Sequence, residues 1–256
     1  MLTIRQDQLE VFRQYHFHKF EDEMVEHSKK FSPILTNLLG DAQLRMALRS
    51  AVRQAKGYGF TNRGPLRLFI EMTFLCGSAF DTDPQYSQIG EVLRFPEDQM
   101  VRAERIHLGT HEYLDRVSGP DNINVRNALI ELSNLAQAPF EFSREDLAQG
   151  LLEKTTRAFP QKVAYCGEKH MKMLIEEGFR EARQYGFSKP RELALIVVLM
   201  FAFGHGCARD PLYPWISRTL QDGKIVSPSA RAERLERKAL TWLSHVLATP
   251  SDEVRA

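Results

Sequence analysis

The sequence predicts an all-α protein built from two similar multi-helix units. Three observations predict this fold class: apolar residues recur at helical spacing along most of the 256 residues, no segment alternates as a strand does, and a long stretch is repeated. The chain is 43% hydrophobic and 26% charged, which is ordinary for a soluble globular protein. Its length suffices for one large core or for two domains of usual size.

The repeat covers most of each half of the chain. Residues 44–89 align with residues 171–216 without a gap after a shift of 127, with 14 identities in 46 positions. Further on, "RAER" at 102–105 matches "RAER" at 231–234. We therefore predict an internal duplication: a first helical unit at 1–120, a connecting helix at 121–139, and a second unit at 140–256 related to the first by a pseudo-two-fold axis.

Within the units, periodicity predicts helices near 5–29, 41–58, 65–76, 97–117 and 228–248. Gly59 stands where the helix at 41–58 should end in a left-handed conformation, and Gly77 closes the next helix. An Asp-Pro pair follows Gly77, and a second pair follows the matching Gly204. Asp favours the cap position and Pro the first helical position, so each pair predicts a helix start. The repeated structural motif comprises Gly59, Gly77, Asp83 and Pro84, matched by Gly186, Gly204, Asp210 and Pro211.

Charge and hydropathy argue against nucleic-acid and membrane partners. The net charge is +1 without a basic stripe, whereas nucleic-acid-binding proteins usually show one. The longest apolar run, 193–204, is shorter than the roughly 20 residues that a spanning helix needs. The N-terminal residues show no apolar segment typical of a signal peptide, and three widely spaced cysteines without a CxxC motif fit a reducing compartment. We expect a cytoplasmic protein.

The best metal-binding candidate lies at 104–112. Glu104, His107 and His111 share one face of a helix, at a spacing that suits zinc or iron. The repeat places Glu236 and Leu240 where the two histidines stand in the first unit. We therefore interpret this face as solvated and expect neither a metal nor a cofactor.

Nucleophilic chemistry has little support in the sequence. His205 and Cys207 lie near a glycine corner, but a thiol–imidazole pair needs contact and a third orienting group. Phe80 matches Cys207 in the first unit, which indicates a packing position and a buried, unreactive thiol. No Walker loop, GxSxG motif or dinucleotide fingerprint occurs. We predict that the protein is not an enzyme and has no catalytic residues.

Several stretches resemble a group of uncharacterised all-helical bacterial proteins encoded near type VI secretion spike, PAAR-tip and effector genes. They are "MLTIRQDQLEVFRQ", "FEDEMVEHSKKFSP", "QAKGYGF", "FIEMTFLCGSAFDTDP" and "GHGCARDPLYPWISRTL". The chain departs from the pattern at "KKFSP" and at residues 205–207. The matching motifs are structural, so the resemblance assigns no catalytic residue.

The resemblance implies a cytoplasmic accessory protein of type VI secretion, acting as an effector chaperone, co-chaperone or adaptor. Its partner would be another protein: an effector, an adaptor or a spike-tip component. Two alternatives stay open, an immunity protein that neutralises a cognate effector and an all-helical metal-dependent enzyme using His107 and His111. Tyr213 and Trp215 are candidate partner-binding anchors, because Gln88 replaces the Trp in the first unit. Core packing is the other reading of Trp215.

Overall fold

The computed structural model describes residues 6–248, and this part of the chain is all-helical, with 13 α-helices and no strand. The first half contains α1 (Gln6–Phe31), α2 (Pro33–Leu39), α3 (Asp41–Gly57), α4 (Arg63–Cys76), α5 (Ser87–Arg94) and α6 (Gln99–Tyr113). The connecting helix is α7 (Ile123–Gln137). The second half contains α8 (Leu147–Ala158), α9 (Pro160–Cys166), α10 (Glu168–Gln184), α11 (Pro190–Phe203), α12 (Pro214–Leu220) and α13 (Pro228–Ala248).

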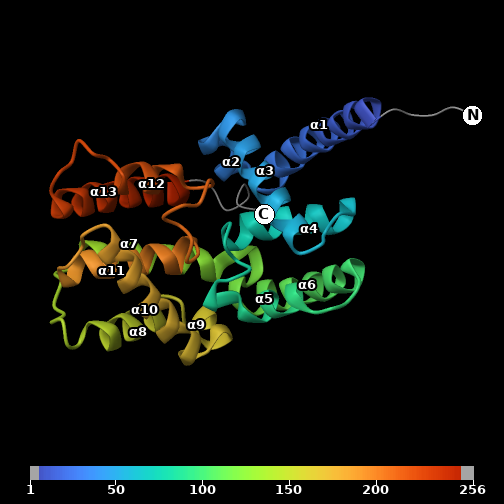
Figure 1. Cartoon of the computed structure of the whole chain (residues 1–256). Helices are drawn as coiled ribbons and strands as arrows, with labels where there is room; N and C mark the ends of the chain where they lie inside the picture. Colours follow the sequence, from blue (N-terminus) through green and yellow to red (C-terminus); the bar gives the residue numbers. More distant parts are fainter. Residues whose placement is uncertain (1–5, 249–256) are drawn as a thin grey trace, which may run out of the picture.

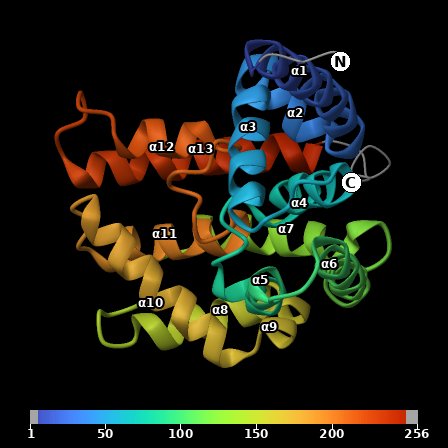
Figure 2. The ribbon, with the colours of Figure 1, turned by 45° about the vertical axis from the view of Figure 1, so that its right-hand side comes forward.

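The two halves lie side by side, α1–α6 on the right of Figure 1 and most of the second half on the left. In the first half α3 packs against α1 and α4, and in the second half α10 packs against α8 and α11. The long helix α13 contacts α7, α11 and α12. Figure 2 shows it running alongside α12. Apolar faces of both halves form one continuous buried core.

Helices of the two halves have matching bounds. After a shift of 127 residues, the bounds of α2, α3 and α4 coincide with those of α9, α10 and α11. The glycines that end these helices adopt the left-handed conformation predicted for them, with φ of +76° at Gly59 and +78° at Gly186. At the second pair of corners φ is +89° at Gly77 and +90° at Gly204.

The repeated "RAER" segments attach α6 and α13 to the turns beneath them. The buried Arg102 guanidinium donates to the carbonyl oxygens of Leu93, at 2.5 Å, and Tyr58, at 2.8 Å. Arg231 binds the matching pair of carbonyls in the second half, at 3.1 and 3.0 Å. Each arginine satisfies carbonyl groups at the ends of helices, which otherwise lack partners.

Both aspartates of the repeated phrase cap a turn. The side chain of Asp83 accepts a hydrogen bond from the N–H of Gln85 at 2.8 Å, and that of Asp210 accepts from the N–H of Leu212 at 2.8 Å. The predicted capping hydrogen bond, to an N–H two residues later, is confirmed at both sites.

The predicted helix starts at Pro84 and Pro211 are wrong by three residues. Pro84 opens a short 3₁₀ turn, η1 (Pro84–Tyr86), and α5 begins only at Ser87. In the second half a turn follows Asp210, and α12 begins at Pro214. The cap bonds stabilise these turns first, and the α-helical hydrogen-bond pattern starts after them.

Candidate functional site

The two glycine corners pack against each other at the centre of the molecule. A Cβ atom placed on Gly77 would lie 2.5 Å from the carbonyl oxygen of Phe203, and one on Gly204 would lie 2.7 Å from that of Cys76. Such distances are far below van der Waals contact with backbone, and both glycines also have positive φ. Only glycine fits at either corner.

The capping aspartates cross between the halves at this point. The second oxygen of Asp83 accepts from the backbone N–H of His205 at 2.7 Å, and the second oxygen of Asp210 accepts from that of Ser78 at 2.7 Å. Each carboxylate thus caps its own turn and holds the corner of the other half. Both side chains are buried, and burial raises the pKa of each carboxyl group above its usual value.

A polar cleft of about 440 Å³ opens beside the crossed corners. We call it the central cleft; its lining comprises Ser78, Ala79, Thr82, Glu177, Arg180, Glu181, Gln184, Met200, His205, Gly206 and Arg209. Its volume falls in the range of small-molecule sites in proteins. The two corner turns form one wall and α10 forms the other.

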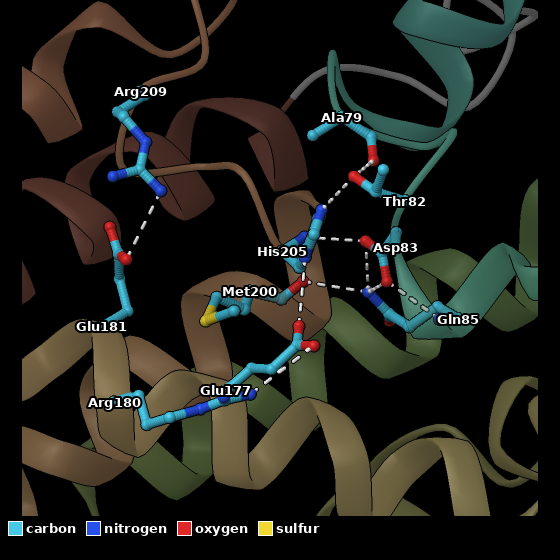
Figure 3. Close-up of polar contacts among 10 residues, drawn as sticks. All are labelled: Ala79, Thr82, Asp83, Gln85, Glu177, Arg180, Glu181, Met200, His205 and Arg209. Atoms are coloured by element: carbon cyan, nitrogen blue, oxygen red, sulfur yellow. Dashed lines mark hydrogen bonds and ion pairs between the residues drawn. The ribbon is translucent and has the colours of Figure 1, made fainter. Parts of the chain in front are cut away.

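Three side chains form a chain of contacts along the central cleft, and Figure 3 shows it. The Nδ1 atom of His205 lies 3.1 Å from a carboxylate oxygen of Glu177, and its Nε2 atom lies 3.0 Å from the hydroxyl oxygen of Thr82. The imidazole and the carboxylate are partly buried, whereas Thr82 is exposed. The structure thereby places a carboxylate, an imidazole and a hydroxyl in a row, each in contact with the next.

A second, apolar cavity of about 150 Å³ lies in the second half. We call it the apolar groove, and it is bordered by α7, the segment 138–142, α8, α11 and α13. Its lining includes the half-buried side chains of Leu135, Phe142, Leu195, Val198, Ala202, Ala239, Leu240 and Leu243. Three polar side chains stand among them: Lys154, Arg191 and Glu236.

The candidate anchors Tyr213 and Trp215 pack inward. Tyr213 is 8% exposed, and its ring lies 4.5 Å from that of Phe203, centroid to centroid. Trp215 is half-buried and meets the same phenylalanine edge-on at 6.0 Å, and its indole N–H is buried without a hydrogen-bond partner. Both contacts are those of packing residues, and the partner-binding role of the pair stays a prediction.

The remaining candidates from the sequence have simple surroundings. Glu104, His107 and His111 are exposed on α6, with the two imidazole rings 4.5 Å apart. Within residues 6–248, no three His, Cys, Asp or Glu side chains are grouped so that they would hold a metal ion. Cys207 is buried, and burial raises the pKa of its thiol, which accords with the unreactive thiol expected there.

Sequence reasoning missed the contact of His205 with Thr82 and Glu177. These residues are 123 and 28 positions from the histidine, and only the crossing of the two corners brings them together. It also missed the apolar groove, because the run 193–204 is apolar at every position and does not distinguish a fully buried face from a half-exposed one. In the structure the half-buried residues of α11 recur at i, i+3 and i+7.

Comparison of the chain with known protein families, with curated proteins and with solved structures finds no match. Among the described residues, no helix is both long enough and apolar enough to cross a membrane.

Proposed function

We propose that this protein is an accessory protein of type VI secretion that works in the cytoplasm by binding another protein, as a chaperone, co-chaperone or adaptor. The observation that carries the proposal is the apolar groove. The family resemblance supplies the biological setting, and the groove supplies a surface on which a partner would bind.

The groove suits an amphipathic helix of the partner. Leu195, Val198 and Ala202 form a stripe along α11, and Leu240 and Leu243 face them from α13. A partner helix would place its own apolar residues, spaced by three and four, between these two helices. Complete burial of one leucine-sized side chain is worth about 1.5–3 kcal/mol, so several such contacts are needed to offset the costs of association and of ordering the partner segment.

Charges at the groove would set the orientation of the partner helix. Arg191 and Glu236 form an ion pair at 2.6 Å, and Arg191 also donates to the carbonyl oxygen of Ala136 at 3.3 Å. Lys154 lies over the ring of Phe142, with Nζ 5.9 Å from the centroid. Opposite charges on the partner would pair with these groups and fix its direction, which contributes specificity more than affinity.

We propose further that the two halves arose by duplication and are related by a pseudo-two-fold axis, and that only the second unit kept an open groove. The shared helix bounds and the crossed aspartates support this origin. In the first half Glu71 matches Val198, and its carboxylate binds His27 of α1 at 2.7 Å. The helix α8 has 12 residues against 26 in α1, so the second half has no counterpart of the N-terminal part of α1.

The groove is tested by charged substitutions on its two helices. Leu195→Asp and Leu240→Asp should each weaken binding of the secretion-locus partner by about 30-fold or more, because a central contact is worth roughly 2 kcal/mol. Leu108→Asp is the matched control, since Leu108 is 62% exposed on α6 and does not line the groove. If both groove variants are folded by circular dichroism and bind the partner as tightly as the wild type and the Leu108→Asp control, the groove is excluded as the binding surface.

A deletion strain of the native bacterium tests the biological role. A chaperone or adaptor predicts that delivery of the neighbouring effector is lost while the strain stays resistant to its siblings. An immunity protein predicts continued delivery and killing of the deletion strain by its parent. Killing of the deletion strain with continued delivery would overturn the proposed chaperone or adaptor role, but not the proposal that the groove binds another protein.

A further inference from the structure

We propose that the central cleft is an acyl-transfer site in which Thr82 is the nucleophile, His205 the general base and Glu177 the group that orients the base. The substrate would be a small ester with a short, polar acyl group. This activity is separate from partner binding, because the central cleft and the apolar groove share no lining residue. It departs from the prediction that the chain has no catalytic residues, because that prediction rests on local motifs and the contacts of His205 join distant parts of the sequence.

The direction of each hydrogen bond follows from the partners of the imidazole. A carboxylate only accepts, so the neutral His205 ring donates from Nδ1 to Glu177, at 3.1 Å. Its Nε2 then carries the lone pair and accepts from the hydroxyl of Thr82, at 3.0 Å. The alternative acceptor for that hydroxyl, the carbonyl oxygen of Ala79, is farther away at 3.3 Å. A hydroxyl, a base and an orienting carboxylate in this order constitute the arrangement that activates a nucleophile.

Buried hydrogen bonds fix the position of Thr82 relative to His205. Thr82 immediately precedes Asp83, whose carboxylate accepts from the backbone N–H of His205 at 2.7 Å. Gln85 donates to the same carboxylate at 3.1 Å and to the carbonyl oxygen of Met200 at 3.1 Å. Two of these bonds, from His205 to Asp83 and from Gln85 to Met200, join the turn that bears the hydroxyl to the half that bears the imidazole, as preorganisation of a site requires.

The repeated architecture does not require these three residues. After the shift of 127, Glu177 and His205 correspond to Ser50 and Ser78, and Thr82 corresponds to Arg209. The matching corner, at Gly77 and Ser78, has the same glycine φ and the matching aspartate hydrogen bonds, made by Asp210, without such a relay. The relay is therefore an addition to the corner rather than part of what folds it.

The surroundings of Thr82 suit a short, polar acyl group. Within the cleft lining only Met200 and the small Ala79 and Gly206 are non-polar, so a long alkyl chain would bury little apolar surface. The guanidinium groups of Arg180 and Arg209 line the same cleft and are 69% and 66% exposed. Arg180 lies 3.8 Å from Glu177, and Arg209 lies 3.4 Å from Glu181, so an oxyanion would compete with these carboxylates for the two guanidinium groups.

The reaction is balanced in protons and electron pairs. The Thr82 oxygen attacks the ester carbonyl carbon while its proton passes to Nε2 of His205. The bond to the alcohol oxygen then breaks, and the alcohol leaves with that proton, which forms an acyl-threonine. Water attacks the acyl carbon, gives its proton to Nε2, and the carboxylic acid leaves as the proton returns to Thr82.

The experiment measures hydrolysis of 4-nitrophenyl acetate together with the intact mass of the protein. Wild type should show an initial burst and an acetyl group on Thr82, and both should be lost in Thr82→Val. His205→Gln should lower the rate by about 100-fold or more, as expected for loss of a general base. Thr82→Ser should keep the activity. His107→Gln is the control for unspecific hydrolysis by exposed histidines, because His107 is exposed outside the cleft.

Equal rates for wild type and Thr82→Val, with no adduct on Thr82 in the folded protein, would overturn the proposal. An NMR titration showing His205 positively charged at pH 7.5 would also overturn it. Both ring nitrogens would then carry protons, and neither could accept the proton of Thr82. Partner binding by the Thr82→Val variant is expected to be unchanged, so failure of this proposal and failure of the proposed binding function are distinguishable.

Discussion

Replacement of Asp83 by alanine tests how the two halves are joined. The carboxylate is 1% exposed and accepts from two backbone N–H groups, that of Gln85 within its own turn and that of His205 from the other half. Asp83→Ala removes both acceptors at once. Asp98→Ala is the matched comparison, because Asp98 caps α6 through a single bond to the N–H of Met100, at 2.8 Å, and is exposed.

The geometry sets the expected magnitudes. A buried or partly buried N–H group left without an acceptor costs about 1–3 kcal/mol, and two such groups, offset by relief of the desolvated carboxylate, give about 2–4 kcal/mol for Asp83→Ala. Loss of an exposed helix cap costs about 1 kcal/mol, which is the value expected for Asp98→Ala. The difference of at least about 1 kcal/mol measures the buried bond between the halves.

Urea unfolding followed by circular dichroism gives both free energies of unfolding. Asp210→Ala should resemble Asp83→Ala, because Asp210 accepts from Leu212 and, across the halves, from Ser78. If Asp83→Ala costs no more stability than Asp98→Ala, the crossed hydrogen bonds contribute nothing, and the argument that the aspartates join the halves is refuted.

Three further predictions follow from the same structure. Gly204→Ala should lower the free energy of unfolding in urea by about 3 kcal/mol or more, because the alanine Cβ would lie 2.7 Å from the carbonyl oxygen of Cys76. Gly64→Ala is the control and should cost nothing, because the space around Gly64 is open. Burial raises the pKa of the Cys76 thiol to about 12 and that of the Cys166 thiol to about 11. Alkylation of these thiols in the native protein should therefore be negligible at pH 8 and should become faster as the pH rises. Rapid alkylation at pH 8 would contradict the burial of the two thiols. Elemental analysis of protein purified without a metal-affinity tag should find no stoichiometric zinc or iron, and one equivalent that disappears in His111→Ala would overturn that expectation.

Local signals in the sequence were sufficient for much of the fold. The predicted helices at 41–58, 65–76 and 228–248 match α3, α4 and α13 within two residues, because apolar periodicity and helix-ending glycines act over one or two turns. The short helices α2 and α9 were missed. No helix was predicted between 29 and 41, where Pro33 occupies the first turn of α2, a position at which a proline is well tolerated.

The sites were much less predictable than the helices. His205 was paired in the sequence analysis with Cys207, two residues away, yet its ring contacts Thr82 and Glu177. That contact depends on how two glycine corners pack, which no local pattern encodes. The apolar groove likewise forms where α7, α8 and the irregular segment between them meet α11 and α13, so its existence is a property of tertiary packing.

Site-specific photocrosslinking in the cells that express this protein tests most directly the proposal that it binds a secretion-locus partner through the apolar groove. A photoreactive phenylalanine analogue is placed at Leu240, in the groove, and separately at Leu108, which is exposed on α6. The account predicts a crosslink from position 240 to an effector, adaptor or spike-tip protein of the secretion locus, and none from position 108. A crosslink to that protein from position 108 but not from position 240 would contradict it.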